Sequence, residues 1–324
     1  MKKIIFTLFL AIMATTGLYA QQISVVSSGG TTSLYRTLQE AIEGAEPGSV
    51  IYLPGGGFPI SDDVKITKKL TIIGIGHYIK SGNIDNNVDG VTTITGNLFF
   101  NEGSSGSAVM GCYFTGSIRI GHDGKAVNDI MIKYSNLFEV TVHNSNCMKT
   151  IVNQCYIRNG GAFGNANVEL SNNIIKNIND ISNGIIKNNI ITESWDYYAL
   201  NKVYSTIIQN NILLQRNTGI HRGADCQISN NMFCREWGED CINIGDTDWN
   251  DIFVNFNNGA ISPTSDFHFK ESYKQYENKV GVYANGTDFD KQLAPVPYIV
   301  AKQIPEQTDA QGKLNIKIRV KAGQ

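Results

Sequence analysis

Four pairs of adjacent asparagines recur along the middle of the chain, each directly before two or more mostly apolar residues. The pairs are Asn172-Asn173, Asn188-Asn189, Asn210-Asn211 and Asn230-Asn231. The second asparagines of successive pairs are 16, 22 and 20 residues apart. A period near 20 residues is typical of a solenoid, in which each turn of the chain stacks on the turn before it. The chain is therefore predicted to form one elongated repeat structure with a continuous core.

Apolar residues flank each asparagine pair at fixed distances. Leu170, Ile186, Ile208 and Ile228 stand three residues before the second asparagine, and Ile174, Ile190, Ile212 and Met232 stand one residue after it. If both positions face the core, the asparagine occupies a corner between two strands, where its tolerance of unusual backbone angles is useful. Stacked amides can also hydrogen-bond along the ladder. We therefore expect Asn189, Asn211 and Asn231 to be buried and stacked.

The cysteines fit the same register. They are Cys112, Cys147, Cys155, Cys226, Cys234 and Cys241. Export to an oxidising compartment would favour disulfides. The register instead assigns Cys112 and Cys155 to the slot of Ile174, with a further turn at Leu137 between them. Because turns lie about 4.8 Å apart, the two sulfurs are too distant to bond. Most thiols are expected to be unpaired, and the lack of a Cys-x-x-Cys motif argues against a zinc site.

Composition and the first residues bear on location. Hydrophobic residues make up 42% of the 324 residues and charged residues 17%, with 32 glycines, which suits tight-turned β structure. A formal charge of −2 does not indicate a nucleic-acid binder. Lys2-Lys3, the apolar stretch 4–13 and Ala20 predict a signal peptide over residues 1–20. The alternative is a transmembrane anchor, for which the apolar run is short, and no membrane span is expected in the mature chain.

The residues after the predicted signal peptide resemble a known fold. Residues 34–46 have a helical apolar face, formed by Leu34, Leu38, Ala41, Ile42 and Ala45. Pro47-Gly48 ends this helix, and strands are expected at 50–53 and 70–74 with Pro54-Gly55-Gly56-Gly57 between them. This order resembles the entry of the pectin lyase-like right-handed parallel β-helix proteins, in which the helix closes the open end. The resemblance implies an all-β, single-stranded right-handed parallel β-helix with an N-terminal capping helix.

The resemblance also divides the chain. The β-helix with its cap is expected over residues 21–290. Residues 263–290 resemble the closing segment of secreted bacterial β-helix proteins, which covers the last turn. Residues 291–324 are expected to form a linker and a C-terminal β extension, because Leu314, Ile316, Ile318 and Val320 alternate with polar residues. This strand is predicted to be one arm of a hairpin that turns at residues 310–312.

Two tryptophans, Trp195 and Trp237, follow their asparagine corners by the same six residues. They are therefore expected on one side of the solenoid. Polar and aromatic residues gather around them in sequence, and the predicted ligand-binding set is Trp195, Trp237, Tyr197, Glu193, Arg216 and Asn243. Aromatic faces with nearby charged groups suit sugar rings, which have apolar faces and hydroxyl rims. The alternative is that the indoles pack under their own loops.

The strands after these loops carry the candidate catalytic residues. Ile220 and Ile242 are expected to point inward on adjacent turns, so that His221 and Asn243 point outward beside Asn201. Asn217-Thr218-Gly219-Ile220 and Gly238-Glu239-Asp240-Cys241-Ile242 resemble, with gaps, two polygalacturonase motifs. That resemblance implies general acid and base roles for Glu239 and Asp240 in an inverting hydrolysis.

A lyase is a second catalytic possibility, because it needs a base and a neutralising cation. His221, Arg222, Arg216 and Lys202 could supply basic groups, and Asp225, Asp240, Asp246 and Asp248 could supply oxygens for Ca²⁺. None of these has a recognised metal-ligand spacing, so no metal site and no cofactor are predicted. His77, His122 and His143 each stand alone in the sequence and are expected to be structural or surface residues.

These observations lead to two functional hypotheses. The first is a non-catalytic glycan-binding or adhesin-like protein whose partner is a polysaccharide. The second is a polysaccharide lyase or glycoside hydrolase, acting on uronate-containing or other polysaccharides. By its resemblance, the protein is expected to be secreted, in the periplasm or at the cell surface of a Gram-negative bacterium.

Overall fold

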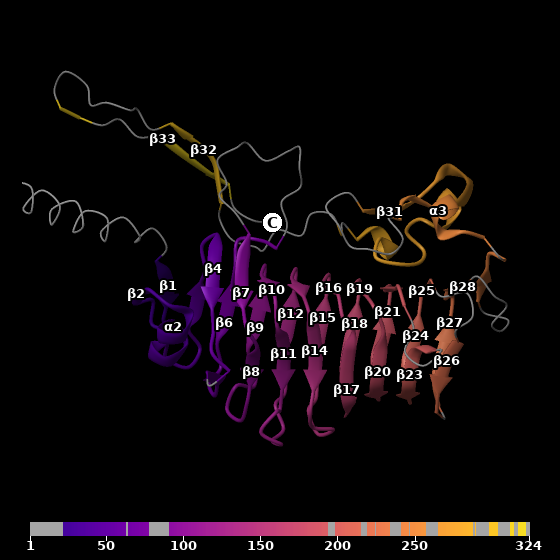
Figure 1. Cartoon of the computed structure of the whole chain (residues 1–324), viewed down its shortest axis with the longest axis horizontal. Coiled ribbons are helices and arrows are strands. Elements are labelled where there is room, and N and C mark those ends of the chain that lie inside the picture. Colours follow the sequence, from indigo (N-terminus) through magenta and orange to yellow (C-terminus); the bar gives the residue numbers. More distant parts are fainter. Residues whose placement is uncertain are drawn as a thin grey trace, which may run out of the picture.

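Three β-sheets wind around one axis to form an elongated coil (Figure 1). The computed structural model describes residues 22–62, 64–77, 91–193, 198–214, 219–223, 225–233, 241–245, 247–256, 265–287, 289, 298–303, 312–313 and 317–321. Within these residues, sheet A has 11 strands, sheet B has 10 and sheet C has 8. Apart from the first two strands of sheet A, neighbouring strands of these sheets run parallel. The chain is a right-handed parallel β-helix, as the repeat and the resemblance predict.

Each turn contributes one short strand to each sheet. Sheet A contains, in spatial order, β2 (Thr32–Tyr35), β1 (Ile23–Val26), β3 (Val50–Tyr52), β6 (Thr71–Ile73), β9 (Ala108–Met110), β12 (Met131–Lys133), β15 (Thr150–Asn153), β18 (Val168–Ser171), β21 (Ile185–Lys187), β24 (Ile207–Gln209) and β27 (Gln227–Ser229). Sheet B contains β4 (Gly56–Pro59), β7 (Thr92–Thr95), β10 (Tyr113–Phe114), β13 (Asn136–Leu137), β16 (Tyr156–Ile157), β19 (Ile174–Ile175), β22 (Ile190–Ile191), β25 (Ile212–Leu213), β28 (Met232–Phe233) and β29 (Ile242–Asn243). Sheet C contains β5 (Lys65–Ile66), β8 (Leu98–Phe100), β11 (Ser117–Ile120), β14 (Glu139–Val142), β17 (Gly161–Ala166), β20 (Ile178–Ser182), β23 (Tyr198–Tyr204) and β26 (Gly219–Arg222).

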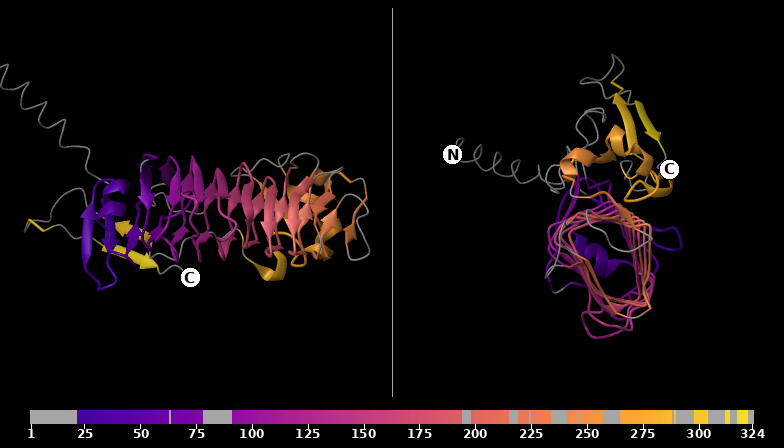
Figure 2. Two further views of the ribbon diagram at one scale, coloured as in Figure 1. Left: turned by 90° about the horizontal axis from the view of Figure 1, so that it is seen from below. Right: turned by 90° about the vertical axis from the view of Figure 1, so that its right-hand side faces the viewer.

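A short helix closes the N-terminal end of the coil. Seen along the axis, α2 (Leu38–Gly44) lies inside the outline of the turns (Figure 2). Thr37 and Glu40 form a capping box at its start, and the helix buries Leu38. The capping helix is confirmed, but its predicted start at residue 34 is wrong. Leu34 lies in β2, which pairs with β1, and its side chain is 59% exposed.

The two asparagines of each pair have different roles. The first asparagine has a positive φ, between 53° and 57° in all four pairs, and so forms the corner. The second asparagine points into the coil. The backbone N–H of Asn189 donates to Oδ1 of Asn211 at 2.9 Å, and the N–H of Asn211 donates to Oδ1 of Asn231 at 2.9 Å. All three side chains are fully buried. The predicted ladder is confirmed.

The same inner column continues toward the N-terminus with other residues. Tyr156 pairs with Ile174, so Cys155 stands level with Asn173, and the N–H of Cys155 donates to Oδ1 of Asn173 at 2.9 Å. Ser135 and Cys112 hold this position in the preceding turns, where the N–H of Cys112 donates to the Ser135 hydroxyl. The prediction that Cys112 and Cys155 share the slot of Ile174 is therefore wrong by one residue. The intervening turn is confirmed.

The slot of Ile174 faces out of the coil instead of into it. Ile175, Ile191 and Leu213 belong to the inner core, whereas Ile174 and Ile190 belong to a second apolar cluster. Ile212 and Met232 join this second cluster. The prediction that these four residues face the inner core is therefore wrong. The sequence did not distinguish the two positions, because both residues after each asparagine pair are apolar.

Free thiols are expected from this arrangement. Cys112, Cys147, Cys155 and Cys226 form no disulfide. Burial raises the pKa of the Cys112 and Cys155 thiols to about 12, so little reactive thiolate is present at neutral pH. Unreduced protein unfolded in guanidinium should therefore release at least four titratable thiols to a thiol reagent, and native protein should release far fewer. An equal count before and after unfolding would contradict the burial of Cys112 and Cys155.

The described residues 247–256, 265–287 and 289, called here the C-terminal segment, pack on the outer face of sheet B from β16 to β28. The segment contains α3 (Trp249–Ile252), β30 (Phe253–Asn255), β31 (Asp266–Phe269) and the 3-10 helices η2 (Glu271–Tyr276) and η3 (Ala284–Gly286). It lies beside the coil, outside its outline, near the last strands of sheet B (Figures 1 and 2). Residues 263–290 were predicted to cover the last turn, but the described part packs along the side of several turns.

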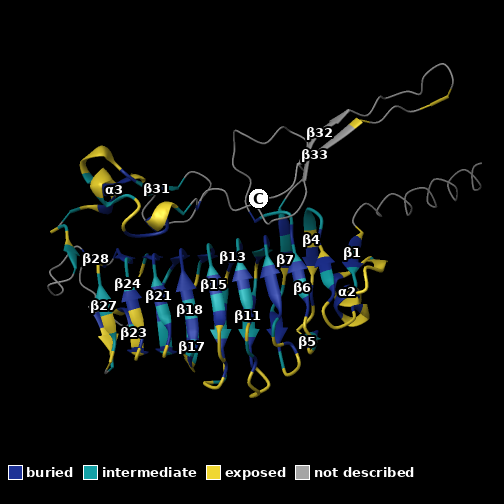
Figure 3. Cartoon of the chain, turned by 180° about the vertical axis from the view of Figure 1, so that it is seen from behind, coloured by how far each residue is buried: buried dark blue, intermediate teal, exposed yellow. Residues whose placement is uncertain are grey.

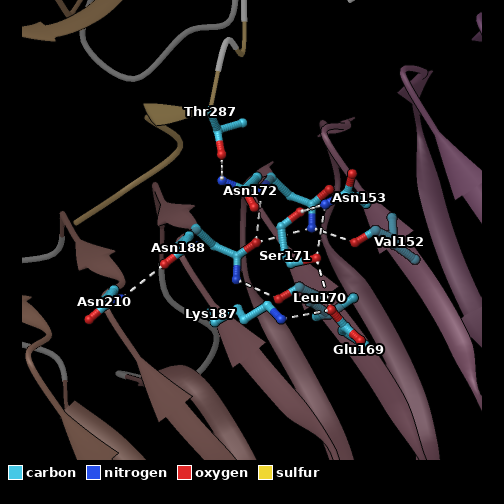
Figure 4. A network of polar contacts seen from close by, with 12 residues as sticks. Val152, Asn153, Glu169, Leu170, Ser171, Asn172, Lys187, Asn188, Asn210 and Thr287 are labelled. Atoms are coloured by element: carbon cyan, nitrogen blue, oxygen red, sulfur yellow. Dashed lines mark hydrogen bonds and ion pairs between the residues drawn. The ribbon is translucent and has the colours of Figure 1, made fainter. Parts of the chain in front are cut away.

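Polar contacts and a glycine fix this segment in place. Nδ2 of Asn172 donates to Oγ1 of Thr287 at 3.1 Å (Figure 4). It also donates to the carbonyl of Val282, at 3.1 Å. The N–H of Gly281 donates to the carbonyl of Asn210 at 2.8 Å. Gly281 has a φ of 74°, and a Cβ there would come within 2.6 Å of Ile212. Figure 3 shows buried residues where the segment meets the coil.

The C-terminal β extension is a hairpin of β32 (Tyr298–Gln303) and β33 (Lys317–Lys321), which pair antiparallel. This confirms the predicted strand around Ile318 and Val320 as one arm of a hairpin. The predicted signal peptide and residues 291–297 of the predicted linker lie outside the described residues. Within the described part of the chain, no helix has the length and hydropathy to cross a membrane.

Candidate functional site on the outer face of sheet C

A column of outward-facing residues runs along sheet C, one from each strand. Its inward neighbours, such as Ile118, Val140 and Leu200, are fully buried, and the alternation of a β-strand therefore turns the column outward. The strand register aligns the first seven members, and the contact between His221 and Asn201 adds the eighth. The column, called here the sheet C column, consists of Lys65, Phe99, Arg119, Thr141, Ala162, Asn179, Asn201 and His221. Adjacent members lie about 4.8 Å apart because parallel strands have that spacing.

The C-terminal half of the column groups amides, an imidazole and a tyrosine. Nδ1 of His221 lies 2.8 Å from Oδ1 of Asn201, and the ring of Tyr198 lies 5.0 Å from the imidazole at an interplanar angle of 33°. His221 is exposed, and Tyr198 is 37% exposed. Asn179 follows on the next strand, in register with Asn201. Since a carboxamide oxygen only accepts, Nδ1 of neutral His221 donates and Nε2 is the basic nitrogen.

Asn179 adds an unusual polar atom to this group. Its Nδ2 donates to Oδ1 of Asn177 at 3.1 Å. Its Oδ1 is buried and has no hydrogen-bond partner among the described residues. A buried acceptor without a partner costs free energy unless a ligand or water donates to it. The column therefore offers both donors and acceptors at neighbouring strands, together with a partly exposed aromatic ring.

Sequence reasoning placed His221 and Asn201 together correctly, and it missed Asn179 and Tyr198. Six predicted site residues lie outside the described residues: Trp195, Tyr197, Arg216, Trp237, Glu239 and Asp240. Glu193 is exposed at the end of sheet B, where its carboxylate lies 3.0 Å from the ammonium of Lys176. Arg222 lies on β26, two residues beyond Ile220.

Asn243 does not share the face of His221, so this part of the prediction is wrong. Ile242 pairs with Met232 and Asn243 with Phe233, which places β29 in sheet B. Ile220, by contrast, pairs with Leu200 in sheet C. Only ten residues separate Met232 from Ile242, which is half of the repeat length. The polygalacturonase-like alignment requires Ile220 and Ile242 on adjacent strands of one sheet, and the structure separates them.

Two of the four aspartates suggested as calcium ligands, Asp225 and Asp248, lie within the described residues, and they have different surroundings. Asp248 caps α3, since its side chain accepts from the N–H of Asn250. Asp225 is exposed in a turn with a φ of 64°. Asp240 and Asp246 lie outside the described residues. Within the described part of the chain, no three His, Cys, Asp or Glu side chains come together as a metal site would require.

Two of the three isolated histidines are not isolated in space. The rings of His122 and His143 meet edge to face, with centroids 4.7 Å apart. Both are exposed, as expected of surface residues. His77 is buried and contacts the ring of Tyr156, so its structural role is confirmed. The contact between His122 and His143 was missed because they belong to turns that lack the asparagine pair.

A hollow lies on the outer face of sheet A. It has a volume of about 270 Å³ and is lined in part by Met131, Ile151, Ile185 and Glu169. The carboxylate of Glu169 is already 3.1 Å from the ammonium of Lys187 (Figure 4). Asp129 and Lys149, which also line the hollow, lie 3.6 Å apart. The charged groups at this hollow are thus paired within the protein, which leaves sheet C as the better candidate for a polar ligand.

No protein-family model matches the chain, and no curated protein or solved structure is significantly similar to it.

Proposed function

We propose that the protein is an exported β-helix that binds a glycan chain along the outer face of sheet C without cleaving it. The observation that carries this proposal is the group of Tyr198, His221, Asn201 and Asn179 on three adjacent strands. An aromatic ring can stack on the apolar face of a sugar, and the amides and the imidazole can hydrogen-bond its hydroxyls. An adhesin-like role at the cell surface agrees with the signal peptide predicted over residues 1–20.

The placement of nearby carboxylates supports binding without hydrolysis. An inverting glycosidase holds two carboxyl groups about 6.5–9.5 Å apart across its substrate. In the described part of sheet C, the carboxylate of Asp180 lies 3.9 Å from the ammonium of Lys202, and that of Glu139 accepts from the Ser117 hydroxyl. At the end of sheet B, Glu193 pairs with Lys176. Each of these carboxylates is engaged with another side chain of the protein.

A polysaccharide lyase is the second candidate. The observation that favours it is the contact between Nδ1 of His221 and Asn201, which fixes the imidazole and leaves Nε2 as a base on an exposed face. A lyase would abstract a proton beside a uronate carboxylate and release an unsaturated product. This product absorbs ultraviolet light, so the two candidates are separable in one assay.

Glycan binding should depend on Tyr198. Purified mature protein would be screened on a glycan array, and the Kd of the best ligand measured for wild type, Tyr198→Ala and His221→Ala. Losing one stacking ring typically weakens binding five- to hundredfold, so we expect a loss of about that size for Tyr198→Ala. Tyr52→Ala is the matched control, because Tyr52 is similarly exposed, at 38%, but lies on sheet A.

Three results bear on this proposal. Equal affinities for Tyr198→Ala and Tyr52→Ala would move the site away from sheet C. The variants Trp195→Ala and Trp237→Ala test whether the predicted aromatic loops also contact the glycan. Incubation with polysaccharides, followed by assays for new reducing ends and for ultraviolet-absorbing products, tests catalysis. A product abolished by His221→Ala would replace the binding proposal with the lyase.

A further inference from the structure

The N-terminal half of the sheet C column gathers basic side chains around one aromatic ring. Nζ of Lys65 lies 3.5 Å from the centroid of the Phe99 ring, and Cζ of Arg119 lies 5.6 Å from it. The ring of His122 lies 5.3 Å from Phe99 and 4.7 Å from the ring of His143. These five residues, called here the Phe99 cluster, come from β5, β8, β11 and the loops that follow β11 and β14.

Cation–π contacts hold the two permanent charges in place. Lys65, Phe99 and Arg119 occupy the same register position on three adjacent strands. The side chains of Lys65 and Arg119 therefore lie over a ring that is only 3% exposed, while the residues themselves stay partly exposed. A cation above an aromatic face is stabilised without being neutralised, since the ring carries no net charge.

The nearby carboxylates of the described residues form hydrogen bonds elsewhere rather than ion pairs with these cations. Glu139 is level with Ser117 on the next strand, and its carboxylate accepts from the Ser117 hydroxyl at 3.0 Å. Asp62 accepts from the side-chain amide of Asn97 at 2.9 Å. Asp123 accepts from the main-chain N–H groups of Glu102 and Lys125. These hydrogen bonds leave the acids charged, but among the described residues none of the three forms an ion pair with Lys65 or Arg119, and Nζ of Lys65 donates to the main-chain carbonyl of Asp62.

The electrostatic effect of the cluster appears in one of its own members. The pKa of His143 lies below its ordinary value of 6.5, chiefly because the ring is partly removed from solvent, and further through electrostatic interactions with His122 and Arg119. Glu139 opposes this shift by a smaller amount. The Arg119 charge thus affects His143 more than the Glu139 charge does.

We infer that the Phe99 cluster is a binding site for oxyanion groups, carboxylate or sulfate, carried on the ligand of the sheet C column. The inference rests on the proposed glycan-binding function, and it specifies that the glycan is anionic. The backbones of Lys65 and Arg119 lie two strands apart, about 10 Å, and both charged groups approach the Phe99 ring between them, so a polymer that lies along the column can contact both. Arg119 supplies donors in the planar arrangement that such oxyanions accept.

A set of dextrans isolates the contribution of charge, because neutral dextran, carboxymethyl dextran and dextran sulfate share one backbone. Binding of the mature protein would be measured by affinity electrophoresis in gels that contain each polymer. We expect retardation by one or both charged forms, much less by neutral dextran, and weaker retardation at higher salt. The comparison of the carboxylated and sulfated polymers shows which oxyanion the cluster prefers.

Two variants test the cluster against a matched control. Arg119→Gln and Lys65→Gln should each weaken binding of the charged dextran about tenfold, the usual effect of losing one charge-assisted hydrogen bond. Lys133→Gln, on the outer face of sheet A, should leave it unchanged. If Arg119→Gln and Lys133→Gln behave alike, or neutral dextran binds as well as the charged forms, the inference is wrong.

The pH dependence gives an independent measure. An anion beside His122 and His143 favours their protonated forms, so binding should tighten as the solution is acidified, and the lowered pKa of His143 places its contribution below pH 6.5. His122→Gln combined with His143→Gln should flatten this dependence, although Lys65, Arg119, Glu139 and Asp123 remain beside the ligand. Wild type that binds equally well at pH 5.5 and 7.5 would contradict a role for the histidines.

The outcomes separate this inference from the proposed function. If Tyr198→Ala weakens glycan binding but Arg119→Gln does not, the glycan site stands and the anion site fails. If Arg119→Gln weakens binding of the charged dextran but Tyr198→Ala affects no glycan, the anion site stands and the proposed group at Tyr198 fails.

Discussion

Replacing Asn211 with leucine should lower the free energy of unfolding by about 3 kcal/mol or more. Oδ1 of Asn211 accepts from the N–H and from Nδ2 of Asn189, and its own Nδ2 donates to the Ile186 carbonyl and to Oδ1 of Asn231. These four contacts measure 2.8–2.9 Å in a column that excludes water. Leucine leaves several of these buried groups without a partner, and each costs about 1–3 kcal/mol.

The measurement is equilibrium urea unfolding followed by circular dichroism. Asn146→Leu is the control, because Asn146 is exposed on a loop and its replacement should change stability by less than about 0.5 kcal/mol. Asn211→Ser should fall between the two, since Ser135 already accepts a backbone N–H at this position of the column. A leucine variant as stable as the Asn146→Leu control would show that the ladder contributes little. If the leucine variant does not fold, the serine variant provides the measurement.

Acidification should destabilise the protein through His77 by about 3 kcal/mol between pH 6.5 and pH 4. Burial lowers the pKa of His77 from 6.5 to about 4, and a contact with the main chain of Tyr134 raises it by less. The unfolded chain therefore binds a proton near pH 6.5, whereas the folded protein stays neutral until about pH 4. Stability from neutral His77 is complete above pH 6.5 and is lost as the pH falls, at about 1.4 kcal/mol per unit.

A variant that cannot titrate isolates this effect from the other acid-sensitive groups. His77→Phe keeps an aromatic ring against Tyr156, whose ring centroid lies 5.7 Å away. Its stability should fall less than that of wild type between pH 7 and pH 4, by about 3 kcal/mol. His122→Gln removes an exposed histidine and should follow the wild-type profile. Parallel pH profiles for wild type and His77→Phe would show that His77 gains its proton without unfolding.

The fold was predictable because its signal repeats. The asparagine pairs specify the period, the corners and the ladder, and each feature depends on contacts between equivalent residues of neighbouring turns. The slot of Ile174 was misplaced because Ile174 and Ile175 are equally apolar. Their difference depends on the C-terminal segment, which covers Ile174 and does not repeat. Leu34 was assigned to the helix for a similar reason, since its partner strand β1 is not part of the repeat.

The candidate site was less predictable, because counting turns fails where the repeat is interrupted. Asn243 was placed one full turn after His221, but β29 follows β28 after only about half of the usual repeat length and pairs beside it in sheet B. The Phe99 cluster was missed because its turns lack the asparagine pair. Apolar residues flank Arg119 and Thr141 in the sequence, and those beside Arg119 are the buried Ile118 and Ile120. This alternation of apolar and polar residues predicts outward-facing side chains and could have located the cluster.

The position of the C-terminal segment has a consequence for the order of folding. Asn172 and Thr287 are hydrogen-bonded to each other across 115 residues of sequence. The turns that carry Ile174, Ile190 and Ile212 can stack as soon as each leaves the ribosome, since each needs only its neighbour. Their outer isoleucines then form a water-exposed apolar strip until the apolar residues of the C-terminal segment, such as Phe253 and Val282, arrive. The interval between the two events is the period in which a nascent chain is most exposed to aggregation, and its length depends on the rate of synthesis.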